Sequence, residues 1–413
     1  MRHPIRAARR RRIGVLMTSC AVTVLAAGSI GLAPAASAGP GVVLAAAESA
    51  VPGSYLVVLD DRATAAPGVP DAARSLTGRY GGEVGAVWQH AVRGFAARMS
   101  AAQAGRMAAD PRVAYVEQDA VARLQGTQLS PPSWGLDRID QRTLPLDGLY
   151  VYPVRPVTSV RVYVIDTGIR TTHSSFNWPY VGLATWGTNT TGDGNDTDCN
   201  GHGTHVAGTI GGWDYGVAKN ARLVAVKAVH CDGSGTTASI VDAINWVTAN
   251  AVKPAVANMS LRVAGSTTID TAVNNSIAQR ITYVVGAGNE NRPACNYSPA
   301  RVPDAVTVTA SDRDDNRPWW PNYGTCVDLY APGQDITSAW HTGDNASYTT
   351  SGTSMSTPHV SGAAAMYLQV NPSATPAQVA AWLRCMATPG AIAGNPAGTP
   401  NLLLYVPPTI GAC

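Results

Sequence analysis

Cysteine is almost absent from the first half of this 413-residue chain. Cys20 lies close to the amino terminus, and residues 39–125 contain neither a cysteine nor a cluster of residue types that carry out catalysis. We therefore expect no disulfide and no active site in that module. The other cysteines follow residue 190, and their even number favours disulfides in an exported protein while leaving the pairing open. They are Cys199, Cys231, Cys295, Cys326, Cys385 and Cys413.

An excess of basic charge is also lacking once the amino-terminal segment is set aside. Residues 1–38 carry six arginines and no acidic residue, whereas residues 126–413 carry 16 basic and 19 acidic residues. The net charge of +3 therefore comes from the leader and gives no indication of nucleic-acid binding. No nucleic-acid partner is predicted.

A second long hydrophobic run is missing, which argues against repeated membrane crossing. The first run, residues 13–32, follows the arginines at 9–12 and precedes Ala36-Ser37-Ala38, the small-x-small pattern of a signal peptidase site. Residues 1–38 are therefore predicted to be a signal peptide, with a twin-arginine export route also open. The mature protein is expected to be secreted and free of the membrane.

Residues 39–125 show alternating strand and helix patterns. Strands are predicted at 54–59, 85–88, 94–98 and 113–117, and helices at 72–77 and 101–107. This order predicts a small ferredoxin-like α+β fold. An independent binding module would have the same pattern, but the position between a signal peptide and a larger domain favours a propeptide.

Residues 126–413 are predicted to form the main domain. Residues 126–133 have linker composition and should be an exposed processing site. Apolar β-branched strands then alternate with helices, which predicts an α/β fold with a doubly wound, mainly parallel sheet. The strands are expected at 160–165, 222–226, 256–261, 281–285 and 305–309, and the helices at 202–210, 237–251, 268–278, 354–368 and 376–386.

Reactive residue types stand at the carboxyl ends of these strands, where such sheets bind ligands. Asp166 ends the first strand, His202 begins a helix and Asn289 follows the strand at 281–285. Ser354 begins a helix rich in small residues. A serine becomes a nucleophile when an imidazole accepts its proton and a carboxylate orients the imidazole. The Asn289 amide and the Ser354 N–H would stabilise the oxyanion.

Each residue also has a plainer interpretation. The serine alone could be a helix N-cap, and the aspartate a cap or a metal ligand. His202 and His205, three residues apart, could bind zinc, but no glutamate lies within or just after the pair. The carboxylates nearby are hard ligands that zinc does not prefer. His205 is therefore expected to be structural, as is His359.

Four motifs in this order resemble those of the subtilisin-like serine proteases: DTG at 166–168, GHGTH at 201–205, GAGN at 286–289 and GTSMSTPH at 352–359. Within that family the chain is most similar to the secreted proteinase K and aqualysin branch, over residues 51–405. The resemblance implies that Asp166, His202 and Ser354 form the catalytic triad and that Asn289 binds the oxyanion. It also implies that residues 39–125 are an inhibitory propeptide that assists folding.

The resemblance sorts the cysteines and implies structural calcium. Two disulfides are expected, Cys199 with Cys231 and Cys295 with Cys326, which leaves Cys385 with Cys413. One calcium site would use the Asp328 side chain and the backbone carbonyls of Pro303 and Ala305. A second, near the mature amino terminus, has Leu149 in place of one expected ligand and would use Asp137, Asp140, Gln141 and Asp147. A third site and a solvated acidic loop are alternatives for Asp193, Asp196 and Asp198.

Substrate should bind along backbone edges, because a protease must hold many sequences in one extended conformation. The resemblance places these edges at Gly233-Ser234-Gly235 and Ser260-Leu261-Arg262, with Gly288 as a further contact. Arg262 stands where relatives usually have glycine. It would either attract acidic substrate residues or, as the simpler expectation, point into solvent. The stretch at residues 317–321, RPWWP, is either a surface loop or a substrate contact.

Together these patterns predict a secreted, monomeric serine endopeptidase made as a self-processing zymogen. Its partners would be polypeptide substrates and its own propeptide. An exopeptidase of the same fold would need an element that blocks one end of the cleft, and no insertion of that size is evident. A catalytically silent binding protein would lack a triad or oxyanion residue, and none is missing.

Overall fold

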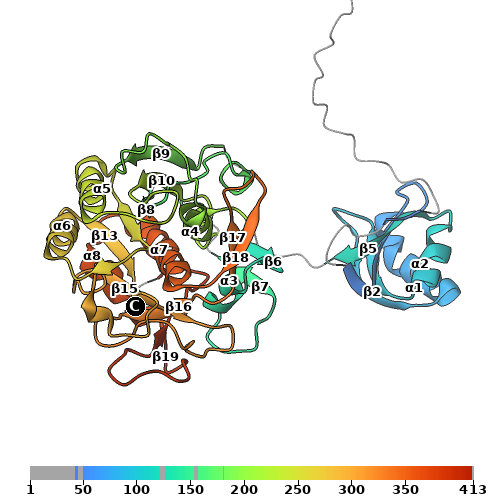
Figure 1. Cartoon of the computed structure of the whole chain (residues 1–413). Helices are drawn as coiled ribbons and strands as arrows, with labels where there is room; N and C mark the ends of the chain where they lie inside the picture. The colour runs from blue at the N-terminus through green and yellow to red at the C-terminus, as the bar shows by residue number, and fades with distance from the viewer. Residues whose placement is uncertain (1–41, 45–49, 121–125, 153–156, 180, 412–413) are drawn as a thin grey trace, which may run out of the picture. The chain divides into compact units, whose positions relative to one another are not determined.

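The computed structural model describes residues 42–44, 50–120, 126–152, 157–179 and 181–411. The predicted signal peptide lies outside these residues. The chain divides into two compact units, Met1–Ala122 and Arg123–Cys413, close to the predicted boundary after residue 125 (Figure 1).

The smaller unit has the predicted ferredoxin-like arrangement. Its sheet runs in the order β1-β5-β2-β4-β3, in which β2 is antiparallel to both β4 and β5. Every second residue at the end of β2 is buried, so Val57 and Leu59 pack against Leu76 and Met107 of the two helices. The elements are β1 (Val43–Leu44), β2 (Ala50–Leu59), α1 (Val69–Tyr80), β3 (Glu83–Trp88), β4 (Gly94–Arg98), α2 (Ala101–Ala108) and β5 (Val113–Ala120), with a 3-10 turn at Ala66–Gly68.

The larger unit contains the predicted doubly wound sheet. The strand order is β19-β20-β16-β15-β13-β11-β8-β10-β9, and neighbours from β20 to β9 run parallel. The strands are β8 (Arg161–Asp166), β9 (Ala184–Asn189), β10 (Arg222–Lys227), β11 (Ala255–Met259), β13 (Ile281–Gly286), β15 (Val306–Ser311), β16 (Leu329–Pro332), β19 (Thr388–Pro389) and β20 (Leu402–Leu403).

Helices cover both faces of this sheet because successive side chains of each buried strand point to opposite sides. In β8, Val162 and Val164 belong to the core on the side of α4 and α7, whereas Tyr163 and Ile165 belong to the core on the side of α5 and α6. Figure 1 shows α7 running along the sheet with α4 beside it. The helices are α3 (Trp134–Ile139), α4 (His202–Gly211), α5 (Thr237–Asn250), α6 (Thr267–Ala278), α7 (Thr353–Val370) and α8 (Pro376–Met386).

Short elements complete the unit, and one of them lies in the predicted linker. Within residues 126–133, β6 (Thr127–Leu129) pairs with β7 (Leu149–Val151). Gln128 in β6 accepts a hydrogen bond from Lys219 Nζ at 2.7 Å and donates one to the Asp214 carbonyl at 2.8 Å. The other short elements are β12 (Val263–Ala264), β14 (Tyr297–Ser298), β17 (Ile336–Ala339), β18 (Ser347–Thr350) and 3-10 turns at Ser174–Phe176 and Ala294–Asn296.

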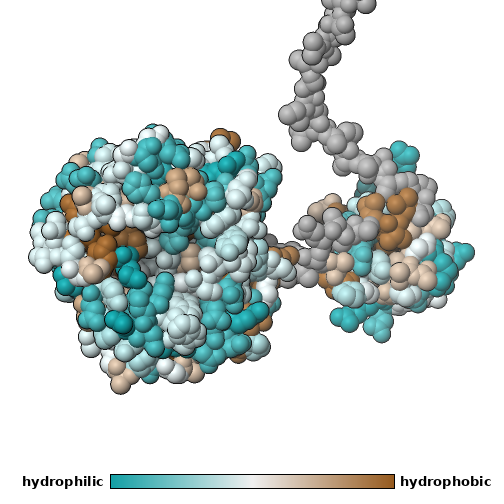
Figure 2. All heavy atoms as spheres, viewed as in Figure 1, coloured by the Kyte–Doolittle hydropathy of each residue, from teal (hydrophilic) through white to brown (hydrophobic). Residues whose placement is uncertain are grey.

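Polar residues prevail on the face of the larger unit that is visible in Figure 2, with apolar residues in smaller groups. Large apolar side chains with high exposure include Trp178 at 67% and Trp319 at 79%. Among the described residues, no helix is both long and apolar enough to cross a membrane.

Candidate active site

The Asp166 carboxylate and the His202 imidazole meet at the carboxyl end of β8. Asp166 is the last residue of the strand and is buried, while His202 is the first residue of α4. His202 Nδ1 lies 2.7 Å from Asp166 Oδ1, which also accepts the backbone N–H of Thr167 at 2.8 Å. With Nδ1 bound to the carboxylate, Nε2 of the imidazole is the nitrogen left to accept a proton.

Asp198 organises the start of α4, a role that sequence reasoning missed. Its Oδ1 accepts the N–H of Gly201 at 2.8 Å and the Thr167 hydroxyl at 2.9 Å. Its Oδ2 accepts the N–H of Thr204 at 2.8 Å and the hydroxyl of the same residue. One buried carboxylate thus joins the turn after β8 to the first turn of α4, where amide groups have no helical partner. An acidic residue just before a predicted helix start was the available signal.

Burial and neighbouring charges act on the pKa of His202 in opposite directions. Burial alone would lower the pKa, because a buried imidazole loses hydration of its charged form. The charge and hydrogen bond of Asp166, together with the charge of Asp198, outweigh this effect and raise the pKa above its ordinary value. The geometry therefore favours an imidazolium at the moment when His202 has accepted a proton.

Ser354 lies in the first turn of α7, where backbone amides lack helical acceptors. Pro358 has no N–H, so the carbonyl of Ser354 loses its usual helical donor. The Ser260 hydroxyl donates to that carbonyl at 3.0 Å instead, and the Ser354 hydroxyl donates to the Ser260 carbonyl at 3.1 Å. These two bonds attach the candidate nucleophile to the segment after β11.

Asn289 is held beside Ser354 by its side-chain oxygen. The N–H and hydroxyl of Thr353 both donate to Asn289 Oδ1, at 2.9 and 3.0 Å. The Thr353 hydroxyl oxygen also accepts the N–H of Gly288 at 3.1 Å. Because the oxygen is anchored in this way, the exposed Nδ2 amide remains available as a donor next to the free N–H of α7.

The two predicted substrate edges differ in exposure. Gly233, Ser234 and Gly235 are exposed, in a turn closed by the hydrogen bond from the His230 N–H to the Ser234 carbonyl at 2.8 Å. Ser260 is buried and Leu261 is partly buried.

Arg262 is exposed, and its charge is paired with a carboxylate. Its Nε lies 2.5 Å from Glu290 Oε1, and its guanidinium lies 5.1 Å from the ring centre of Tyr297. Glu290 lies 28 residues away in sequence, so no local pattern indicated this pair.

The other two histidines of the sequence motifs, His205 and His359, are packed inside the unit. His205 Nε2 donates to the carbonyls of Ile336 and Tyr348, and His359 Nδ1 lies 2.8 Å from the Met355 carbonyl. Burial lowers the pKa of His205 and of His359 to about 4, so both are neutral near pH 7. Their surroundings agree with the predicted structural roles.

The predicted calcium ligands fit a cation unequally. Among the described residues, no group of three or more His, Cys, Asp or Glu side chains is placed to hold a metal ion. Asp328 already has partners for both oxygens, Arg384 Nη1 at 3.0 Å and the Thr307 N–H at 2.8 Å. Asp140 fits better, because its Oδ1 is buried without a partner and burial raises its pKa to about 7.

The neighbours of Asp140 are partly committed to other contacts. Asp137 accepts the N–H groups of Asp147 and Gly148 at 3.2 and 2.9 Å, and the Gln141 amide donates to the carbonyls of Thr143 and Pro145. Charged Asp137 and Asp147 add to the raised pKa of Asp140.

The third acidic group lies in a loop where Asp193 and Asp196 are exposed and Asp198 is buried. Asp193 pairs with the buried Lys227 Nζ at 2.8 Å, Asp196 accepts the Asn189 amide at 3.2 Å, and Asp198 is the buried carboxylate described above. The Asn189 amide also donates to Asp193 Oδ1 at 2.8 Å, so it joins the two exposed acids.

Two of the predicted disulfides are present, Cys199–Cys231 and Cys295–Cys326. The third predicted pair includes Cys413, which lies outside the described residues. The first disulfide fixes the loop that contains Asp198 and precedes His202.

The loop at 317–321 is tied to the segment that follows Asn289. The Trp320 carbonyl accepts the N–H of Asn291 at 2.8 Å, and Arg317 Nη2 donates to Asn291 Oδ1 at 2.7 Å. Trp319 is 79% exposed at the tip of this anchored loop. These contacts explain the position of the loop.

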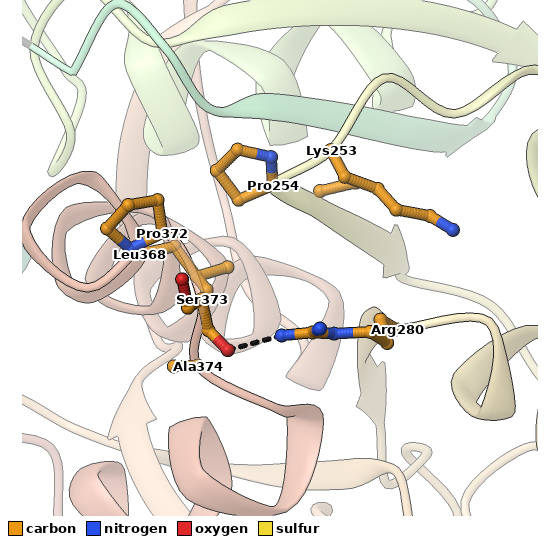
Figure 3. Close-up of a pocket in the computed structure, with 8 residues that line it drawn as sticks. Lys253, Pro254, Arg280, Leu368, Pro372, Ser373 and Ala374 are labelled. Carbon is orange, nitrogen blue, oxygen red and sulfur yellow. Dashed lines mark hydrogen bonds between the residues drawn. The ribbon is translucent and has the colours of Figure 1, made fainter.

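A separate cavity of about 320 Å³ lies where β11 and β13 begin, at the opposite end of the strands from Asp166. Figure 3 shows Arg280 reaching toward the carbonyl of Ser373, with which it forms a hydrogen bond. The cavity wall contains no partnered nucleophile and base. It is lined by Lys253, Pro254, Ala255, Arg280, Leu368, Pro372, Ser373 and Ala374.

The chain was compared with known families and proteins. Residues 158–401 match the subtilase family, and residues 54–125 match peptidase inhibitor I9. An extracellular serine proteinase of Thermus sp. (strain Rt41A) is 48% identical over 87% of this chain and 91% of its own. Alkaline serine exoprotease A of Vibrio alginolyticus is 42% identical over 88% of this chain and 69% of its own.

A solved structure agrees with these matches. A cold adapted subtilisin-like serine proteinase is 48% identical to this chain, with a TM-score of 0.63, and the likeness covers 66% of this chain and 97% of that one. The matched families, the parallel sheet and the grouping of Asp166, His202, Ser354 and Asn289 point in one direction. This chain belongs to the subtilase family of serine proteases and carries an I9 inhibitor propeptide before its peptidase unit.

Proposed function

We propose that this secreted serine protease is an endopeptidase of the proteinase K-like branch, with Asp166, His202 and Ser354 as its triad. The observation that carries the proposal is the 2.7 Å contact of Asp166 with His202, at the strand ends where the first turn of α7 presents Ser354. Asn289, anchored by Thr353, is the proposed oxyanion donor.

In the proposed reaction the Ser354 oxygen bonds to the carbonyl carbon while its proton passes to His202 Nε2. The carbonyl electrons move onto oxygen, where Asn289 Nδ2 and the Ser354 N–H stabilise the negative charge. When the C–N bond breaks, His202 returns the proton to the leaving amine. Water then repeats the sequence on the acyl-enzyme, which releases the acid and restores the serine.

The choice between internal and terminal cleavage needs a direct test, since one relative is named an exoprotease. The exposed backbone at Gly233–Gly235 favours an open groove that accepts chain on both sides. An endopeptidase cleaves a peptide with an acetylated amino terminus and an amidated carboxyl terminus, whereas an exopeptidase requires a free end. Cleavage only of the unblocked peptide would overturn the endopeptidase proposal.

The nucleophile is tested by labelling the protein with a fluorophosphonate. The label should appear on Ser354, and the Ser354→Ala variant should neither react nor degrade casein. Labelling at another residue, or casein cleavage by the variant, would contradict the assignment.

We also propose that the zymogen processes itself and that the cleaved propeptide inhibits the peptidase unit. The match of residues 54–125 to an inhibitor family supports this order of events. The wild-type chain should separate into two fragments near the boundary of its units, and the Ser354→Ala chain should remain intact. Equal fragmentation of both chains would assign the cleavage to another protease.

Calcium is proposed as a structural ion at Asp140, with Asp137 and Asp147 nearby and backbone carbonyls or water as further ligands. A bound cation would satisfy the buried Asp140 Oδ1. Calcium at 100 times its Kd should stabilise the fold by about 2.7 kcal/mol. A chelator should therefore lower the Tm of the wild type and have less effect on Asp140→Asn.

The same measurement examines Asp328, where Arg384 now occupies the place of a cation. If calcium binds there as well, Arg384→Ala should enlarge the effect of the chelator. A Tm that no chelator changes in any of the three proteins would remove calcium from the proposal.

A further inference from the structure

Two chain segments enclose Ser354. The segment after β11 contacts it through the Ser260 carbonyl, 3.1 Å from the serine hydroxyl oxygen. The segment after β13 contacts the same turn of α7 through Asn289, whose Oδ1 accepts the Thr353 N–H at 2.9 Å. A peptide carbonyl that bonds to Ser354 and points at Asn289 must lie between these segments. The side chain of the same peptide residue therefore lies along one or both of them.

Arg262 joins the two segments. Arg262 follows Ser260 by two residues, and Glu290 directly follows Asn289. The Nε of Arg262 lies 2.5 Å from Oε1 of Glu290. The arginine stem lies against Gly288, because a Cβ at that glycine would lie 3.2 Å from Arg262 Cδ and 2.9 Å from Glu290 Oε2. Gly288 also has a φ of +103°, which favours glycine. The turn at Gly288 thus leaves room for the Arg262 side chain to pass directly beside the segment that contains Asn289.

Glu290 is fixed in this place by further bonds. Its Oε2 accepts the N–H of Asn289 at 3.1 Å and the side-chain amide of Asn322 at 2.9 Å. Asn322 is fully buried and also accepts the N–H of Glu290 at 3.0 Å. The carboxylate therefore cannot swing away when a substrate approaches. Among the described residues, Arg262 is its cationic partner.

The pair is only partly exposed, with 42% of the Arg262 side chain and 24% of the Glu290 side chain open to solvent. Tyr297 lies under the guanidinium at 5.1 Å and limits its freedom further. Without Arg262, the fixed and half-buried negative charge of Glu290 would lie next to the substrate residue whose carbonyl is attacked by Ser354. With the arginine, that charge is neutralised.

We propose that Arg262 is a specificity-determining residue that masks Glu290, so that the enzyme prefers uncharged over cationic side chains immediately before the cleaved bond. The inference rests on the proposed endopeptidase function. A lysine at that substrate position meets a carboxylate that already has a cation and a guanidinium that repels it. An apolar side chain meets instead the arginine stem and Gly288. The proposed specificity depends as much on repulsion of a cationic substrate side chain as on contact with an apolar one.

The test uses blocked tetrapeptide amides that differ only in the residue before the cleaved bond, which is Phe, Lys or Glu. For each variant, kcat/KM on the Lys peptide is divided by kcat/KM on the Phe peptide. Arg262→Met retains the apolar stem and removes the charge, so this ratio should rise about tenfold. Arg262→Lys retains a charge and should stay much closer to the wild type.

Two further variants assign the effect to Glu290. Glu290→Gln frees the guanidinium and should raise the Glu-to-Phe ratio. The double variant Arg262→Met with Glu290→Gln has neither charge and should lose the gain on the Lys peptide. A ratio unchanged in Arg262→Met, or a gain that persists in the double variant, would overturn the proposal.

Fluorophosphonate titration counts active sites in each variant, so that a misfolded preparation is not taken for altered specificity. A wild type that labels at Ser354 and cleaves all peptides without the expected ratios would contradict only the role of Arg262. A wild type that does not label at Ser354 would contradict the proposed function itself.

Discussion

The two ends of the central sheet differ sharply in chemistry, although the same strands supply both. At the carboxyl end, β8 finishes in the buried Asp166, and β11 and β13 lead to Ser260 and Asn289. At the amino end, β8 begins at the partly buried Arg161, and Arg280 stands in a turn just before β13. The polar residues at the first end bond to one another, whereas Arg280 bonds to a backbone carbonyl.

The helix termini explain this difference. Helices α4 and α7 begin at the carboxyl end, so their unpaired amide groups and partial positive charge are concentrated there. The amino end receives the end of α7, whose unpaired groups are carbonyls. The cavity in Figure 3 is sizeable at about 320 Å³, yet it lies at this end. The direction of the helices therefore indicates the end of the sheet with the candidate active site better than the volume of a cavity does.

The strongest test of the comparison replaces one serine at each end. Ser354→Ala should lower kcat by about 10⁶-fold, the size of the effect when the serine of subtilisin is removed. Ser373→Ala, in the cavity wall at the amino end, should leave kcat and KM unchanged. Both are measured on one chromogenic peptide with purified mature enzyme. A large loss in Ser373→Ala would show that the amino end takes part in catalysis.

The next largest effect is expected at the oxyanion donor. Asn289→Leu removes the amide that would face the developing charge and should cost about 10²–10³ in kcat, as loss of the subtilisin donor does. KM should change much less, because the interaction is made mainly in the transition state. Asn250, an exposed asparagine at the end of α5, provides the control, and Asn250→Leu should leave kcat unchanged. A change in KM alone for Asn289→Leu would place the amide in ground-state binding.

Sequence patterns predicted the strands that carry the site but not the contacts that complete it. β8, β10, β11, β13 and β15 are apolar and β-branched, and each was predicted to within a few residues. β9 was missed because an edge strand with the sequence ATWGTN is only partly buried and lacks alternation. Short α3 was missed as well, since six residues carry little periodicity.

The site residues divide in the same way. Asp166, His202, Asn289 and Ser354 stand in motifs that the sequence displays. The roles of Asp198 and Arg262 depend on partners about 30 residues away, Thr167 and Glu290. A sequence pattern indicates local geometry and burial, but it does not indicate which distant loops come into contact. The partners of charged residues on such loops therefore could not be predicted from sequence patterns.

A smaller effect should appear in the pH profile, again only at the carboxyl end. The proposed base is neutral His202, so kcat/KM should fall as pH drops through a pKa that Asp166 and Asp198 hold above the ordinary value of about 6.5. Asp198→Asn removes one of these charges and should shift the acid limb to lower pH. An acid limb that does not move would exclude Asp198 from the electrostatics of the base.

The contribution of His202 to folding stability should change with pH in the opposite direction to kcat/KM. Protonated His202 is favoured in the folded state, so its contribution is present below the unfolded pKa and is lost as pH rises through the folded pKa. Asp198→Asn should also cost about 1–3 kcal/mol, since a carboxylate with several donors is weakened at the start of α4. Urea unfolding at two pH values separates this constant loss from the pH-dependent one.

The smallest expected effect lies at the amino end, where Arg280 has a φ of +66°. Arg280→Gly and Arg280→Ala both lose the hydrogen bond to Ser373, but glycine adopts this φ without strain whereas alanine does not. The glycine variant should therefore be more stable than the alanine variant by about 1 kcal/mol in urea unfolding. Because both changes are confined to a turn before β13, kcat/KM should equal that of the wild type in each. A change in activity that follows the stability difference would mean that strain at the beginning of β13 reaches Asn289 beyond its end, and the two ends of the sheet would then be mechanically coupled.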